Sequence, residues 1–135
     1  MAVELIRIAN DGSIGFGDYT LAEKSKLSDF PHLGDLYKVK TYAEITKLER
    51  NGSFVYESVP GTKVENFKEE DRKVSFEVEG LANTQITLDL EEEKEYRVIV
   101  DDTNLGKMTT NVGGKLVISL DLTGGKSQSV VIERI

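Results

Sequence analysis

The chain has 135 residues, with no cysteine, no tryptophan, one histidine, 39% apolar residues and 30% charged residues. This composition is typical of a soluble folded protein of one domain or two small ones, and it excludes disulfides and zinc sites with sulfur ligands. The net charge of −7, without a visible cluster of basic residues, argues against partners such as nucleic acid or an anionic membrane.

The sequence also bears on the cellular compartment. No apolar run approaches the roughly 18–20 residues of a membrane-spanning helix. The opening residues, MAVELIRIAND, place Glu4 and Arg7 inside a short apolar stretch and do not follow the layout of a signal peptide. We therefore expect a cytoplasmic protein, or a secreted one if the chain is trimmed from a longer precursor. We expect no cofactor and no bound metal.

Residues 1–59 read mostly as short strands, because apolar and polar residues alternate with a period of two. Asn51-Gly52 between two alternating segments is the strongest hairpin signal in the chain. The expected strands are Val3–Ile8, Ser13–Phe16, Leu36–Tyr42, Ile45–Glu49 and Phe54–Val59.

One window favours a short helix. The segment Leu21–Phe30, LAEKSKLSDF, follows Thr20 as a candidate N-cap, and Glu23 stands three residues after it. The apolar face of such a helix is thin, so an ordered loop is the alternative.

Pro60-Gly61 marks a predicted boundary between an N-terminal β subdomain, residues 1–59, and a β-sandwich domain, residues 60–135. The second part contains seven short alternating segments separated by turn signals, a pattern typical of a small sandwich. The expected strands are Lys63–Phe67, Lys73–Glu79, Gln85–Leu90, Tyr96–Asp101, Gly106–Thr110, Lys115–Leu122 and Gln128–Arg134. The predicted fold is all-β, with a small N-terminal hairpin or meander packed on this seven-stranded sandwich.

Two resemblances bear on this prediction. Residues 62–135 resemble the immunoglobulin-like sandwich modules of bacterial surface and carbohydrate-active proteins, and the segment YRVIVD at 96–101, followed by Gly106, Thr109 and Gly113-Gly114, carries this resemblance. The whole chain also resembles short acidic bacterial proteins labelled endosialidases, which implies a small hydrolase acting on glycans. The chain has no tryptophan for Asp-box repeats, and its five arginines are scattered, so we do not carry that activity over.

A first candidate site is the segment Ile14-Gly15-Phe16-Gly17-Asp18-Tyr19. Aromatic faces beside a carboxylate suit a sugar, since the ring stacks and the acid accepts hydroxyl protons. The alternative is that the two glycines form a bulge while Phe16 fills the core. We expect Phe16, Asp18, Tyr19, Tyr42 and Tyr56 to supply the exposed ligand-binding residues, if the protein binds carbohydrate.

Three further candidates have simpler alternatives. His32 between Asp29 and Asp35 could act as a general base for Ser25 or Ser28, or it is a solvated turn residue. The segment 101–106 could hold calcium but lacks the EF-hand spacing, which favours a hairpin turn. The acidic residues of 65–95 could include a catalytic pair, but their positions in turns and on solvent faces favour a solvated surface. We therefore assign no catalytic and no metal-binding residue.

Seven of the ten aromatic residues lie in residues 1–59, which is enriched in the side chains that interfaces favour. A segment this small needs further packing against the sandwich or a neighbouring chain. We therefore expect a non-catalytic binding or assembly protein that forms homo-oligomers, with Tyr37 and Phe54 at the interface. A carbohydrate-binding accessory module is the alternative, and a small glycan-acting hydrolase is the second alternative.

Overall fold

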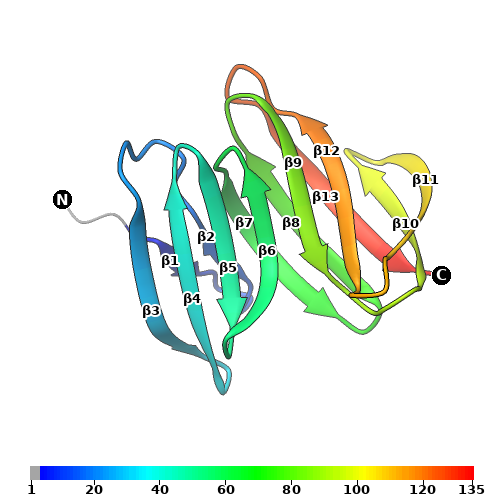
Figure 1. The fold of residues 1–135 in the computed structure, drawn as a ribbon, viewed down its shortest axis with the longest axis horizontal. Helices are drawn as coiled ribbons and strands as arrows, with labels where there is room; N and C mark the ends of the chain where they lie inside the picture. Colours follow the sequence, from blue (N-terminus) through cyan, green and yellow to red (C-terminus); the bar gives the residue numbers. More distant parts are fainter. Residues whose placement is uncertain (1–3) are drawn as a thin grey trace.

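The protein is an all-β sandwich of two antiparallel sheets (Figure 1). A computed structural model describes residues 4–135, so Val3 of the first expected strand lies outside the described residues. The seven-stranded sheet runs in the order β1 (Ile6–Ile8), β2 (Ile14–Phe16), β7 (Lys63–Glu70), β8 (Lys73–Glu79), β13 (Ser127–Arg134), β10 (Glu95–Val100) and β11 (Thr103–Thr109). The six-stranded sheet runs β12 (Lys115–Asp121), β9 (Asn83–Asp89), β6 (Ser53–Val59), β5 (Ile45–Arg50), β4 (Asp35–Tyr42) and β3 (Ser25–His32).

The alternation seen in the sequence places one face of each sheet against the other. In β8, Val74, Phe76 and Val78 are buried while Glu77 is exposed. An aromatic cluster occupies the core on the side of β2, β6 and β7, where Phe16 and Tyr56 pack edge to face with ring centroids 5.1 Å apart. Phe67 lies 5.6 Å from the Phe16 ring. Edge-to-face contacts of this kind suit the opposite charges of ring face and ring edge.

Both sheets contain strands from either side of Pro60-Gly61. β2 pairs with β7 in one sheet, and β6 pairs with β9 in the other. The boundary expected after residue 59 therefore falls between two strands, β6 and β7, that belong to different sheets. The seven strands expected in residues 60–135 are all present, with ends displaced by up to three residues.

The predicted helix at 21–30 is wrong. Residues 19–20 form a turn, residues 22–23 form a bend, and β3 begins at Ser25. The side chains of β3 alternate between half-buried and exposed as far as Ser28. A bulge follows, in which Asp29 has φ 56°, and after it Phe30 again lies on the inner side of the sheet. Packing of Leu27 and Phe30 against the core outweighs the weak helical signal. Pro31 is tolerated because β3 is an edge strand.

The Asn51-Gly52 hairpin is confirmed. Asn51 has φ 52° and Gly52 has φ 81°, the left-handed pair that a two-residue hairpin turn requires. Asp101 and Asp102, which the sequence offered as calcium ligands or turn residues, adopt φ 49° and 66° in the turn between β10 and β11. Across the described part of the chain, no helix is long and apolar enough to cross a membrane.

Candidate functional site

Lysines gather on the outer face of the six-stranded sheet, at the end formed by β3, β4 and β5. Lys26 lies directly opposite Lys40, and Lys40 lies directly opposite Lys47. Lys38 is two residues from Lys40 and so shares this face. We call Lys26, Lys38, Lys40 and Lys47 the lysine face. The expectation that basic residues do not cluster is therefore wrong, because strand pairing joins lysines that are far apart in the sequence.

The lysine face surrounds a small hollow of about 60 Å³, which Glu49 also lines. Lys47 Nζ lies 3.7 Å from Glu49 Oε1. Within residues 4–135, this is the only ion pair that any of the four lysines makes. Like charges directly opposite each other destabilise a sheet. The arrangement therefore has an unfavourable electrostatic energy that an anion placed over the hollow would lower.

Protection of a sheet edge accounts for only part of this arrangement. A lysine on an edge strand discourages pairing with other chains, and Lys26 lies on the edge strand β3. Lys38, Lys40 and Lys47 lie on β4 and β5, which have a neighbour on both sides. Edge protection therefore does not explain the positive charge of these three lysines, and another role has to account for it.

Carboxylates and aromatic rings border the lysine face. Glu57 lies opposite Lys47 on β6, and beyond it the same row continues to Thr87 and Val117. Tyr42 Oη donates a hydrogen bond of 2.6 Å to Glu44 Oε2, and this bond raises the pKa of Tyr42. The cationic surface is therefore compact and ends at acidic side chains on two sides.

The structure separates the five residues expected to bind a sugar. Phe16 and Tyr56 are fully buried, contrary to the expectation that they are exposed, because both rings belong to the aromatic cluster of the core. Tyr42 borders the lysine face, where Lys24 Nζ lies 5.9 Å from its ring centroid. Asp18 and Tyr19 are brought together, but on another part of the molecule.

Asp18 and Tyr19 line a hollow of about 340 Å³ together with Arg7, Lys63 and Glu79. Tyr19 Oη donates a hydrogen bond of 2.5 Å to Glu79 Oε2. This bond, with a smaller effect of burial, raises the pKa of Tyr19 to about 12. Asp18 Oδ1 accepts hydrogen bonds from the backbone N–H and the hydroxyl of Thr20. These bonds already use part of the capacity of this carboxylate to accept hydrogen bonds from a ligand. The sequence analysis counted Glu79 among the acidic residues of 65–95 but did not place it beside Tyr19, which lies 60 residues away in the chain.

The two expected interface residues occupy different environments. Tyr37 is 7% exposed and belongs to the core. Phe54 is half-buried and lies opposite Glu49, which places it on the outer face beside the lysine face. Lys115 Nζ covers the Phe54 ring at 4.9 Å from its centroid.

His32 is positioned by the backbone of another turn. Its Nε2 lies 2.9 Å from the carbonyl oxygen of Gly12. It lines a cavity of about 400 Å³ with Asp11, Ser13 and Asp35. Ser13 Oγ donates a hydrogen bond of 2.6 Å to Asp11 Oδ1, which directs this hydroxyl to the carboxylate. Ser25, Ser28 and Asp29, the residues first considered beside His32, do not line this cavity.

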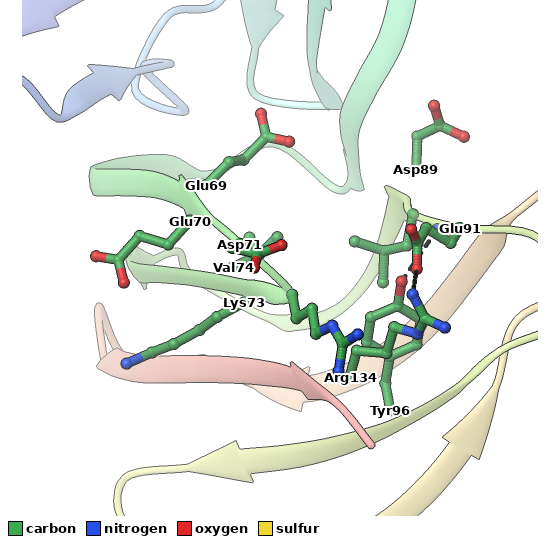
Figure 2. Close-up of a pocket in the computed structure, with 11 residues that line it drawn as sticks. Glu69, Glu70, Asp71, Lys73, Val74, Asp89, Glu91, Tyr96 and Arg134 are labelled. Atoms are coloured by element: carbon green, nitrogen blue, oxygen red, sulfur yellow. Dashed lines mark hydrogen bonds and ion pairs between the residues drawn. The ribbon is translucent and has the colours of Figure 1, made fainter.

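A further cavity of about 410 Å³ lies where the β7–β8 turn faces the β9–β10 loop (Figure 2). Arg134 forms an ion pair with Glu91, and Tyr96 Oη accepts a hydrogen bond of 3.1 Å from the backbone N–H of Glu91. These contacts fasten the start of the β9–β10 loop to the end of β13 and to β10. Three basic side chains, Arg72, Lys73 and Arg134, line the cavity together with five acidic ones, which are Glu69, Glu70, Asp71, Asp89 and Glu91.

Comparison with protein-family models, with curated proteins and with solved structures gave no match. Within residues 4–135, no group of three or more histidine, cysteine, aspartate or glutamate side chains is arranged to hold a metal ion. Arguments about function therefore depend on the geometry of the chain itself.

Proposed function

We propose that the protein is a non-catalytic binding and assembly module that forms homo-oligomers through the outer face of β3, β4 and β5. The observation that carries the proposal is the row Lys26, Lys40 and Lys47, three directly opposed lysines in a chain of net charge −7. The row lies within residues 1–59, the part of the chain expected to supply the contact. Residues 62–135 fit the proposal as an immunoglobulin-like sandwich module that supports this face.

The basis of the proposed contact is electrostatic, with an aromatic contribution at its border. Tyr37 is buried, so a charged residue at this position would disturb folding and would not report on assembly. Phe54 remains an interface residue in the proposal, because its ring lies on the same outer face as Glu49. Contacts between exposed charges weaken as salt rises, since the Debye length falls from about 10 Å at 0.1 M to about 3 Å at 1 M.

The test is the solution mass of the full chain, measured by light scattering over a range of protein concentrations at low and at high salt. We expect a mass above 15.0 kDa at low salt that falls toward the monomer as salt is added. A mass of 15.0 kDa at every concentration and at low salt would refute homo-oligomer assembly.

A substitution locates the contact. Phe54→Glu adds a carboxylate beside the lysine face and should lower the oligomer mass. Val117→Glu is the matched control, because it makes the same charge change on the same sheet face, on β12 at the far edge. Equal masses for the two variants would show that the contact lies elsewhere.

Carbohydrate binding is a second proposal, favoured by the hollow that gathers Asp18, Tyr19 and Glu79. A sugar there would stack on the half-buried Tyr19 ring and donate hydroxyl protons to the carboxylates. A panel of polysaccharides titrated by calorimetry tests this proposal, with Tyr19→Ala as the variant that should lose binding. No heat of binding for any member at high concentration would exclude it.

A further inference from the structure

The partner of the lysine face, if the proposed assembly holds, follows from the charges on the rest of the chain. Residues 89–95, DLEEEKE, carry five carboxylates and one lysine. They connect β9 to β10, and the side chains of residues 91–95 are all exposed. Glu91 is paired with Arg134 and Asp89 with Lys115, whereas Glu92 and Glu93 make no ion pair within residues 4–135. We call residues 91–93 the acidic loop.

The acidic loop is held in a fixed conformation by backbone contacts. Thr110 Oγ1 donates a hydrogen bond of 2.6 Å to the carbonyl oxygen of Glu91 and accepts one of 2.9 Å from the N–H of Lys94. The N–H of Glu93 donates to the carbonyl oxygen of Asn111 at 3.2 Å. A loop that is ordered before binding loses little conformational entropy when it docks.

The β7–β8 turn is a weaker candidate for the same role. Glu69 is paired with Arg50, and Arg72 stands in the turn beside Asp71. The carboxylates of the β7–β8 turn are therefore partly neutralised by arginines of the same molecule. The acidic loop presents Glu92 and Glu93 with only Lys94 next to them in the sequence.

We propose that the acidic loop of one copy docks on the lysine face of the next, with Glu92 and Glu93 directed to the ammonium groups around the 60 Å³ hollow. The dimensions fit, because three adjacent strands span about 10 Å, which one tight turn can cover. A long polyanion fits less well, since it would meet Glu57 and Glu44 where the lysine face ends. A compact acidic turn occupies the cationic surface without reaching them.

The two surfaces are different, and β6 separates β5, which carries Lys47, from β9, which leads into the acidic loop. In Figure 1, β3 and β4 lie on the left and the β9–β10 connection lies on the right. Contact between the lysine face and the acidic loop allows two arrangements. Two copies exchange both contacts across a two-fold axis, or the contacts continue from copy to copy as a ring or an open chain. In either arrangement each copy uses one lysine face and one acidic loop.

Mixing two charge-reversed variants of the full chain tests this arrangement. The face variant is Lys26→Glu with Lys40→Glu, and the loop variant is Glu92→Lys with Glu93→Lys. Each variant alone lacks one of the two surfaces and should remain at 15.0 kDa at low salt. In an equimolar mixture, the intact acidic loop of the face variant meets the intact lysine face of the loop variant. The reversed loop also complements the reversed face in charge, so the mixture should assemble as alternating copies with a mass above 15.0 kDa.

The control is Lys107→Glu with Lys126→Glu. These two substitutions change the net charge by the same amount as the face variant, but they are made at exposed positions outside β3–β5. This control should keep the wild-type mass. Recovery of assembly on mixing also shows that both variants are folded. The mixed contact is expected to weaken by at least tenfold in Kd between low and high salt.

Three results would overturn the inference. If wild type forms oligomers that the face and loop variants retain, assembly stands but uses other surfaces. If both variants are monomeric and their mixture stays monomeric, the lysine face and the acidic loop are not partners. If wild type is monomeric and binds dextran sulfate through Lys26 and Lys40, the lysine face serves a polyanion and the proposed assembly fails as well.

Discussion

The hydroxyl groups of Tyr56 and Thr62 lie 2.8 Å apart in the core, although Pro60-Gly61 separates them in the chain. Ser58 Oγ lies 2.8 Å from the same Thr62 hydroxyl. Thr46 Oγ1 exchanges hydrogen bonds with the backbone of Thr62, accepting from its N–H and donating to its carbonyl oxygen. All four residues are fully buried, so these bonds satisfy polar groups that water does not reach.

Replacing Thr62 with valine should destabilise the protein by about 1–3 kcal/mol, because the buried hydroxyls of Tyr56 and Ser58 lose their shared partner. Urea unfolding followed by circular dichroism measures the loss. Thr109→Val is the matched control, since Thr109 is exposed on the edge strand β11 and its substitution should cost less than about 0.5 kcal/mol. Equal losses in the two variants would contradict the role of this network.

Gly17 should tolerate alanine less well than Gly52. Both have positive φ, 90° and 81°, so alanine strains the backbone at either position. At Gly17 the added Cβ would also lie 2.5 Å from the carbonyl oxygen of Thr62, whereas at Gly52 it would meet nothing within 4 Å. Gly17→Ala should therefore lose clearly more unfolding free energy in urea than Gly52→Ala. Similar losses would show that the close approach to Thr62 relaxes without cost.

The Tyr19–Glu79 hydrogen bond should appear in the alkaline titration of the protein. Glu79 raises the pKa of Tyr19 from 10.0 to about 12, so the folded state favours the protonated phenol. The resulting stability is present below pH 10 and is lost as the pH rises toward about 12. Difference absorbance between wild type and Tyr19→Phe should show one tyrosinate transition near pH 12. Glu79→Gln should move that transition toward 10, and an unmoved transition would exclude Glu79 as the cause.

Asp11 should govern part of the acid titration. The hydroxyl and then the backbone N–H of Ser13 hold the pKa of Asp11 down, from 3.8 to about 2. A lowered pKa stabilises the folded state above pH 3.8, and this contribution is lost as the pH falls toward about 2. In Ser13→Ala, carboxyl NMR should report a pKa closer to 3.8 for Asp11. Asp121, whose pKa is lowered by Thr123, is the internal control and should not move.

Most strands of residues 60–135 could be predicted well because their apolar residues alternate, although a bulge interrupts this alternation in β7. Lys73–Glu79 has the predicted limits, and the strand signalled by YRVIVD starts one residue earlier, at Glu95. The Asn51-Gly52 turn was equally clear, since few residues adopt its backbone conformation. β3 was missed because the bulge at Ser28–Asp29 breaks its alternation of apolar and polar residues. The broken pattern mixes the two-residue period of a strand with a spacing closer to that of a helix.

The lysine face was hidden for a related reason. Lys40 and Lys47 are opposed because the two-residue turn Ala43-Glu44 fixes the β4–β5 register. This turn contains no glycine, asparagine or proline, which are the residues that indicate a turn in a sequence. The pairing of Lys26 with Lys40 requires in addition the one-residue shift made by the bulge in β3. Cross-strand neighbours depend on such shifts, which composition and spacing do not encode.

The central position of β13 has a consequence for how the chain is made. β13 lies between β8 and β10, and both of its neighbours are synthesised before it. All six strands of the other sheet have left the ribosome once Asp121 has emerged, so that sheet can complete itself first. The part of its apolar inner face that β13, β10 and β11 cover stays exposed until β13 is complete at residue 134, because the β10–β11 hairpin joins its sheet only through β13. During this interval the nascent chain exposes the surface that chaperones bind, and a ribosome stalled between residues 121 and 134 would hold a half-built sandwich.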